Sequence, residues 1–280
     1  MSSPHRSLDN LISIAKKIKK NIPNKKIRIW FTGGEPTANP NFVEFCKYLK
    51  ENVVTNIGLN SNGSRNVKYH LELMKYVNRI QFSSHFEFMD IDKFLENIES
   101  IPRKKCSLNL MAEPEHWDKV KRLVGFCEQR GINYHLKRIR PKYQWVPAPV
   151  TKTLYNSYGV PNAGLSNSVE YTPPYTEEQI EWLEEKEHVQ LEDENGNNVH
   201  KPDVLIYPNI DDEPEEKWAN DFINNQQDNF FGWLCGVGLE GIEINANGTI
   251  HRGVCGVGGN ISHVDDEDWK LPKNFIVCNR

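Results

Sequence analysis

Short apolar runs alternate with amphipathic segments along the first half of the chain. Between residues 7 and 20 the apolar residues recur every three or four positions, which predicts a helix. KIRIWF at 26–31 has the length of a buried strand, and NPNFVEFCKYLKEN at 39–52 shows helical spacing, opened by an asparagine and a proline. The alternation continues with strands over 55–63, 79–84, 105–111 and 132–139 and helices over 66–76, 90–100 and 115–130.

Five strands separated by helices, without hairpin signals between them, predict an α/β fold. Such strands run parallel with right-handed helical crossovers, in an open sheet or in a barrel. In both architectures ligands bind at the C-terminal ends of the strands. Small or polar residues follow all five strands: GGEP (33–36), NSNG (60–63), SSH (83–85), MAEP (111–114) and RIRP (138–141). Each end alone is typical of a turn, but five at one rim indicate a shared pocket.

The stretch FTGGEPTANP at 31–40 carries the most specific of these strand ends. Glycine permits tight turns and proline ends strands, so an ordinary exit from the sheet explains part of the pattern. The alternative is that a ligand comes close to the backbone at Gly33 and Gly34. Glu35 would then offer an acceptor-only carboxylate to a bound ammonium group.

The regular alternation ends after Pro141. Residues 141–175 are rich in Pro, Tyr, Asn and Ser and predict an irregular connection, followed by a helix over 176–188. Residues 189–200 predict a hairpin about Asn195-Gly196, and the acidic run 211–217 is typical of a solvated loop.

Cysteines flank a second predicted hairpin near the C-terminus, where GIEIN and TIHRG enclose residues 246–248. Cys235 precedes the hairpin and Cys255 follows it, so the two thiols can come together, and Cys278 lies further along the chain. Thiolates on glycine-rich loops suit zinc or iron–sulfur ligation. Buried free cysteines are the alternative, since a metal site normally needs four ligands and three are present here.

Composition narrows the class of protein. The chain has 280 residues and a formal net charge of −4, with a mean hydropathy of −0.64. The charge argues against a dedicated nucleic-acid binder, and no apolar run has the length of a membrane span. Six cysteines without an apolar signal segment are typical of reduced thiols or metal ligands. We therefore expect a cytoplasmic protein that neither spans a membrane nor binds nucleic acid.

The ordered strand ends resemble those of radical S-adenosylmethionine (radical SAM) enzymes. GGEP, NSNG, SSHFEF, LNLMAEP and LKRIRP follow one another as in that superfamily over roughly residues 5–140. Residues 230–280, from Cys235 to Cys278, resemble the auxiliary-cluster extension called SPASM. The resemblance implies a partial parallel (β/α)6 barrel with a small cysteine-containing β-hairpin extension. It also implies S-adenosylmethionine and iron–sulfur clusters as cofactors.

The resemblance assigns cofactor roles to individual positions. Gly33, Gly34 and Glu35 would hold the methionine amino group of S-adenosylmethionine. The positions matching those near the ribose or carboxylate are Ser61, Asn62 and Ser83. Cys235, Cys255 and Cys278 would ligate an incomplete auxiliary cluster. In the family a reduced 4Fe-4S cluster cleaves the cofactor, and the resulting 5'-deoxyadenosyl radical takes a hydrogen atom from the substrate.

One departure from the family pattern concerns the catalytic cluster. The family holds that cluster with a C-x3-C-x2-C triad after its first strand, ahead of a helix like the one at 7–20. No two of the six cysteines here lie within four residues of each other. We therefore expect the first strand and the triad segment to be absent, and both edges to be cut. Cys46, Cys106 and Cys127 fall in predicted helices or strands and are expected to be buried thiols.

These observations predict three regions and leave several functions open. The regions are a partial radical SAM core at 1–140, a connection at 141–230 and a SPASM-like region at 231–280. The chain is then a radical SAM enzyme or a fragment, inactive alone, with a peptide or protein as possible substrate. Alternatives are a non-catalytic remnant that binds S-adenosylmethionine or a partner protein, and an unrelated α/β nucleotide-binding protein. Arg138 and Arg140 are candidate pocket residues, equally explained as surface groups, and His85 is a third candidate, although a histidine at a strand end is more often a structural group.

Overall fold

The computed structural model describes residues 5–22, 26–54, 56–87, 89–138, 175–187, 204–206, 213, 215–217, 230–269 and 271–279. These residues belong to two compact units. The larger contains residues 26–138 together with 175–187, 204–206, 213 and 215–217. The smaller contains residues 5–22 and 230–279 without residue 270. The predicted hairpin at 189–200 and most of the predicted connection at 141–175 lie outside the described residues.

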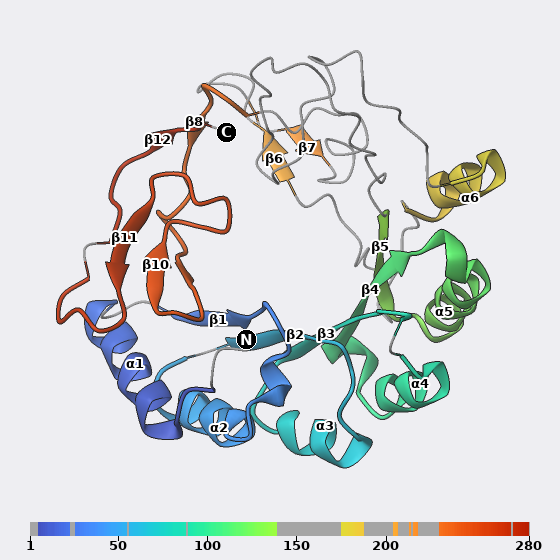
Figure 1. The fold of residues 1–280 in the computed structure, drawn as a ribbon, viewed down its shortest axis with the longest axis horizontal. Coiled ribbons are helices and arrows are strands. Elements are labelled where there is room, and N and C mark those ends of the chain that lie inside the picture. Colours follow the sequence, from blue (N-terminus) through green and yellow to red (C-terminus); the bar gives the residue numbers. More distant parts are fainter. Residues whose placement is uncertain are drawn as a thin grey trace, which may run out of the picture. The chain divides into compact units, whose positions relative to one another are not determined.

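The larger unit is built on a five-stranded parallel sheet in the order β1-β2-β3-β4-β5 (Figure 1). Its strands are β1 (Arg28–Phe31), β2 (Asn56–Ser61), β3 (Arg79–Ser83), β4 (Cys106–Ala112) and β5 (Asn133–Arg138). The connecting helices are α2 (Phe42–Asn52), α3 (Val67–Leu73), α4 (Ile91–Glu99) and α5 (Trp117–Arg130). Short 3-10 turns lie at Pro36–Ala38, Arg103–Lys105 and Pro114–His116. The alternation predicted from the sequence is confirmed as an α/β fold with parallel strands.

Local signals explain where the helices begin and end. Asn66 caps α3, accepting a hydrogen bond from the Tyr69 amide at 2.9 Å. Asp90 caps α4 in the same way. Gly131 ends α5 in the left-handed conformation, at φ 60°. The predicted elements have the right type and order, but α2 starts at Phe42 and not at residue 39, because residues 39–41 form a turn in which the Asn41 amide donates to Asn39 Oδ1 at 2.9 Å.

One face of the sheet is apolar and packs against α2–α5, which lie on the convex side in Figure 1. The strand residues that face the helices are buried, among them Ile57, Leu59, Ile80, Phe82, Leu108, Leu110, Tyr134 and Leu136. Aromatic rings mark the contact: Phe31 meets Phe42 at 5.1 Å between centroids, and Phe82 meets Phe94 at 5.9 Å. This layer is the hydrophobic core of the unit.

The alternate strand residues point to the opposite, concave side and are mostly polar or charged. We call them the polar face: Arg28, Trp30, Asn56, Gly58, Asn60, Arg79, Gln81, Ser83, Ser107, Asn109, Met111, Asn133, His135 and Lys137. The indole of Trp30 lies over Gly58, where an added Cβ would be 2.2 Å from the ring. The Trp30 Nε1–H donates to Asn60 Oδ1 at 3.0 Å. Strand register therefore gathers these side chains on one face of the sheet, and this face is not part of the hydrophobic core.

Helix α6 (Glu177–Glu187) packs at the β5 end of the sheet. Trp182 stacks edge-on against Trp117 at 5.1 Å, and the Lys186 ammonium donates to Glu128 at 3.0 Å. Glu128 raises the pKa of Lys186 through this hydrogen bond. Strands β6 (Val204–Ile206) and β7 (Glu215–Lys217) pair antiparallel. The acidic run predicted as a loop therefore contains a short strand, because its backbone pairs with β6.

The smaller unit joins helix α1 (Leu8–Asn21) to the C-terminal region. Its strands are β8 (Leu234–Cys235), β9 (Glu243–Ile244), β10 (Thr249–His251), β11 (Asn260–His263) and β12 (Ile276–Val277). β10 pairs antiparallel with both β9 and β11, and β8 pairs with β12. Buried Ile250, Val264 and Trp269 form its core, against which Ile14 and Ile18 of α1 pack.

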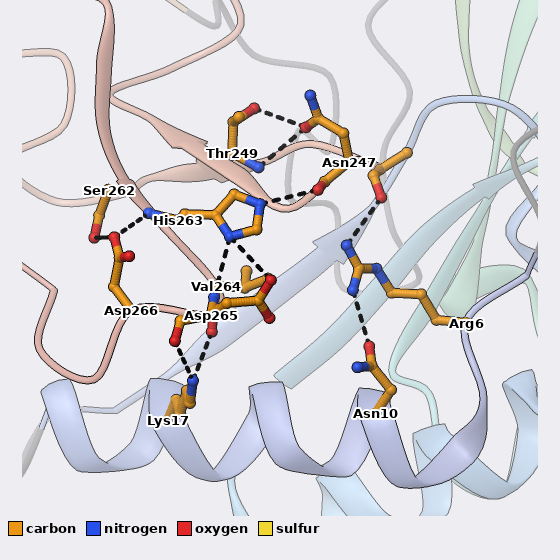
Figure 2. A network of polar contacts seen from close by, with 11 residues as sticks. Arg6, Asn10, Lys17, Asn247, Thr249, Ser262, His263, Val264, Asp265 and Asp266 are labelled. Atoms are coloured by element: carbon orange, nitrogen blue, oxygen red, sulfur yellow. Dashed lines mark hydrogen bonds and ion pairs between the residues drawn. The ribbon is translucent and has the colours of Figure 1, made fainter.

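Polar contacts also attach α1 to this region (Figure 2). The Lys17 ammonium donates to the carbonyls of Val264 and Asp265, each at 3.0 Å. The Arg6 guanidinium bonds the carbonyl of Ala246 at 3.3 Å. These contacts join positions about 240 residues apart in the sequence. The helix predicted at 7–20 is confirmed, and it belongs to the same compact unit as the cysteine-containing region.

Candidate functional site

The turn after β1 exposes its backbone. Gly33 and Gly34 both have positive φ values, 79° and 56°. A Cβ added at either position would meet nothing within 4 Å. Glycine is needed for this backbone conformation, and the missing side chains leave the peptide groups open to a ligand.

The carboxylate of Glu35 joins this turn to the end of β2. Its Oε1 accepts three hydrogen bonds, from the Thr37 amide at 3.1 Å, the Thr37 hydroxyl at 2.6 Å and the Ser61 hydroxyl at 3.0 Å. Its Oε2 accepts one, from the Asn62 amide at 2.6 Å. A carboxylate has about four acceptor positions, two on each oxygen, so Oε1 is saturated and Oε2 retains one. Glu35 thus holds two strand ends together, and one acceptor position on Oε2 has no donor among the described residues.

Arg65 and Asn97 reinforce the same rim, and the sequence patterns did not single out either residue. The Arg65 guanidinium donates to the Thr37 carbonyl at 2.9 and 2.7 Å and lies over the Tyr69 ring at 5.3 Å. The buried Asn97 amide donates to the carbonyls of Gly63 and Arg65, at 2.9 and 2.7 Å. The position of Arg65, just after the NSNG turn, is a sequence signal that could have identified it. Asn97 has no such signal, because it lies in α4, about 30 residues along the chain from the carbonyls that it binds.

A pocket of about 570 Å³ opens beside this rim, at the C-terminal ends of β2, β3 and β4. It is lined by Asn62, Gly63, Ser64, His85, Glu87, Met89, Asp90, Lys93, Phe94 and Glu113. Both signs of charge are represented, and Phe94 supplies an apolar wall. A Cβ on Gly63 would come within 2.9 Å of the Phe94 ring, so this glycine shapes the pocket. The pocket suits a ligand that carries cationic and anionic groups together with an apolar part.

The structure brings together five of the six residues predicted to bind the cofactor. Gly33, Gly34, Glu35, Ser61 and Asn62 form one cluster through the contacts above. Ser83 ends β3 beside Asn109 and makes no hydrogen bond to the cluster in the described part of the chain. It belongs to the polar face, whereas the Ser61 hydroxyl bonds Glu35.

The three further candidate pocket residues are His85, Arg138 and Arg140, and only His85 lines the pocket in the described structure. His85 is exposed and lines the pocket. Arg138 ends β5 on the side of the sheet that faces the helices. Arg140 lies outside the described residues.

The three C-terminal cysteines differ in exposure: Cys255 is exposed, Cys235 is half-buried and Cys278 is buried. In the β8–β12 pair, Cys235 lies opposite Ile276, so Cys278, two residues further, faces the same side of the ribbon. Gly258, in the loop that carries Cys255, lies against Ile276. Even so, no three His, Cys, Asp or Glu side chains are arranged to hold a metal ion anywhere in the described ranges.

The other three cysteines are buried thiols, as expected. Cys46 lies in α2, Cys127 in α5 and Cys106 at the start of β4. Burial raises the pKa of Cys46 and of Cys106 to about 12, and it raises the pKa of Cys127 as well. These thiols therefore stay protonated at neutral pH and are poor metal ligands.

The residues present fit one of the two implied cofactors. The open glycine turn, the remaining acceptor position on Glu35 and the adjacent pocket suit S-adenosylmethionine, which carries an ammonium, a carboxylate and an adenosyl group. They do not fit an iron–sulfur cluster at the rim, because no described cysteine lies there.

The fold and the site define an α/β protein with a five-stranded parallel sheet and a cluster of polar groups around Glu35 at the C-terminal ends of β1 and β2. Residues 2–134 match the family model described as Radical SAM superfamily, which is just under half of the chain. The match covers α1, β1–β4 and α2–α5, and so includes the whole Glu35 cluster. No curated protein matches the chain significantly. Within the described ranges, no helix combines the length and the apolar character required to cross a membrane.

Proposed function

We propose that this chain is a radical SAM protein whose rim at Gly33, Gly34 and Glu35 binds S-adenosylmethionine. The observation that carries the proposal is the Glu35 carboxylate, which joins the glycine turn to Ser61 and Asn62 and keeps an acceptor position on Oε2. The family match over residues 2–134 supports the same assignment.

In this proposal the chain's own residues bind and orient the cofactor. Gly33 and Gly34 present peptide groups to the methionine part, and the open Oε2 position of Glu35 accepts from its ammonium. Asn62 and the polar groups that line the pocket would hold the ribose and the carboxylate.

The finer functional predictions also belong to the proposal. The substrate is a peptide or a protein, and Cys235, Cys255 and Cys278 are ligands of an auxiliary cluster. The common orientation of Cys235 and Cys278 on the β8–β12 ribbon supports the second point. Because the sequence contains no C-x3-C-x2-C triad, we propose that this chain alone produces no 5'-deoxyadenosine. Binding of S-adenosylmethionine without catalysis is the second candidate function, and the missing triad favours it.

Calorimetry with S-adenosylmethionine tests the proposal. We expect measurable binding by the chain and a ten- to hundredfold weaker affinity for Glu35→Ala, because a charge-assisted hydrogen bond contributes about 1.5–3 kcal/mol. Glu44→Ala, which removes an exposed carboxylate from α2, is the matched control and should bind normally. Equal affinities of the Glu35→Ala variant and the unmodified chain would refute the assignment of Glu35.

Product analysis separates the two candidate functions. After anaerobic reconstitution with iron and sulfide, the chain is incubated with dithionite and S-adenosylmethionine. We expect no 5'-deoxyadenosine and at most a substoichiometric cluster, which Cys255→Ala should abolish. Formation of 5'-deoxyadenosine would overturn the proposal that this chain is inactive alone.

A further inference from the structure

The indole of Trp30 is held in one orientation on the sheet and stays accessible. Its six-membered ring lies against Gly58, where an added Cβ would be 2.2 Å from the ring, so glycine is required at that position. The Trp30 Nε1–H donates to Asn60 Oδ1 at 3.0 Å, and the Asn60 amide donates to Thr32 Oγ1 at 3.1 Å. Trp30 nevertheless remains 46% exposed, although tryptophan is highly buried on average. The ring is therefore a fixed aromatic surface that a ligand can reach.

Two arginines lie on the same face as this ring. Strand register places Trp30, Gly58 and Arg79 in one row across β1, β2 and β3. Arg28 lies two residues before Trp30 on β1. Strand geometry puts the Cα atoms of Arg28 and Arg79 about 7 Å and about 10 Å from that of Trp30, and the long arginine side chains can bridge both distances. The two guanidinium groups can therefore reach a ligand that contacts the ring.

Neither arginine has a counter-ion. Arg28 and Arg79 are both exposed, and neither makes a hydrogen bond or an ion pair with any residue in the described ranges. None of the residues of β1–β5 is Asp or Glu, although the chain as a whole has 38 acidic residues. Two cations without a carboxylate between them repel each other, and a bound anion removes this repulsion. The surroundings of Trp30 therefore suit a ligand with negative charge.

These residues lie away from the cofactor rim. Arg28 begins β1 and Arg79 begins β3, so both lie at N-terminal strand ends. Glu35 and Asn62 follow the C-terminal ends of β1 and β2. A ligand held by the two arginines therefore leaves the hydrogen bonds of Glu35 intact.

The chemistry of these groups identifies the ligand. A nucleic-acid base stacks on an aromatic side chain whatever its identity, because every base has a π-face. A guanidinium group binds phosphate with two parallel hydrogen bonds, and a phosphate has enough acceptor oxygens for two arginines. A nucleotide joins a base to a phosphate through one ribose. It therefore matches an indole that has an arginine on each of two sides.

We propose that Arg28, Trp30 and Arg79 form a binding site for a nucleoside monophosphate. The base stacks on the indole of Trp30, and the two guanidinium groups bind the phosphate. This site goes beyond the proposed function, because it concerns a second ligand and requires neither Glu35 nor S-adenosylmethionine. The two proposals can therefore fail separately.

NMR titration of the tryptophan indole N–H signals tests the proposal. The probes are AMP, adenosine, which lacks the phosphate, and ribose 5-phosphate, which lacks the base. We expect AMP to shift the Trp30 signal, which is assigned by its loss in Trp30→Phe, and to bind at least tenfold more tightly than either other compound. The signal of Trp233, an exposed tryptophan of the smaller unit, is the internal control and should not move. An unshifted Trp30 signal at millimolar AMP, or equal affinities for AMP and adenosine, would overturn the proposal.

Variants assign the two halves of the ligand, with affinities measured by calorimetry. Arg28→Gln and Arg79→Gln change exposed side chains and should each weaken AMP binding several-fold while adenosine binding stays the same. Lys121→Gln removes the same charge from the exposed surface of α5 and should have no effect. Trp30→Leu should remove the advantage of AMP over ribose 5-phosphate. Unaltered AMP binding in both arginine variants would reject the phosphate contact.

Further controls separate this site from simple anion binding and from the cofactor rim. Displacement of AMP by inorganic phosphate at similar concentration would reject the stacking on Trp30. Glu35→Ala should leave AMP binding unchanged, and Trp30→Leu should leave binding of S-adenosylmethionine unchanged. Loss of both ligands in Trp30→Leu would overturn the separate site, because the indole would then belong to the cofactor site. Retained AMP binding without binding of S-adenosylmethionine would refute the proposed function alone.

Discussion

Replacement of Glu35 by glutamine should loosen the link between the glycine turn and β2 at one defined atom. Glutamine keeps a carbonyl oxygen that can accept from Thr37 and Ser61, in place of Oε1. It puts an amide N–H₂ group where Oε2 accepts from the Asn62 amide at 2.6 Å. Two donors then face each other, and one charge-assisted hydrogen bond is lost. Such a bond contributes about 1.5–3 kcal/mol, equivalent to roughly a 10- to 150-fold change in an equilibrium constant.

Amide hydrogen exchange followed by NMR measures this effect directly. In Glu35→Gln, exchange of the Asn62 amide should accelerate by roughly 10- to 100-fold, because local opening becomes easier by the lost hydrogen-bond energy. The Thr37 amide should change much less, since its acceptor at Oε1 is retained. Glu44→Gln, on the exposed side of α2, is the control and should alter neither amide. Unchanged protection of Asn62 in Glu35→Gln would refute the reasoning that the carboxylate joins the two strand ends.

Three other predictions concern groups outside the rim. Iodoacetamide at pH 8, followed by peptide mapping, should label the exposed Cys255 rapidly and leave Cys46 and Cys106 unlabelled. The reason is that burial raises the pKa of the Cys46 and Cys106 thiols to about 12. Rapid labelling of Cys46 would contradict its burial. Burial lowers the pKa of His70 below its ordinary value of about 6.5. As the pH drops below about 6.5, His70 therefore takes up a proton in the unfolded chain before it does so in the folded protein. The free energy of unfolding should then fall by up to about 1.4 kcal/mol per pH unit. Urea unfolding of His70→Leu should show a smaller loss between pH 7.5 and 5.5, and an unaltered loss would exclude His70 as its source. Lys17→Met should destabilise the packing of α1 by about 1–2 kcal/mol, because it removes two hydrogen bonds, and amide exchange in β10 and β11 should become faster. Lys16→Met, which changes an exposed side chain of the same helix, should have no such effect. Equal amide exchange in the two variants would show that the Lys17 contacts contribute nothing.

The sequence alone determined the order and type of the elements in the larger unit. Periodicity is a local property, so the alternation of apolar runs and amphipathic segments was enough to predict five parallel strands and their helices. The glycine pair before Glu35 also predicted an open turn at this strand end, because positive φ values and an open backbone depend on residue type. Burial of Cys46, Cys106 and Cys127 followed from their positions within regular elements.

Only the tertiary structure decided which side chains meet. The donors to Glu35 come partly from Ser61 and Asn62, 26 and 27 residues along the chain, and no local pattern records that pairing. The polar face exists because strand register aligns Gln81 with Ser107 and Ser83 with Asn109; a shift of one residue would turn each of them towards the helices. The contacts of Lys17 with the carbonyls of residues 264 and 265 also depend on tertiary structure, because they form only when α1 packs on the C-terminal strands, which lie almost 250 residues away in the sequence.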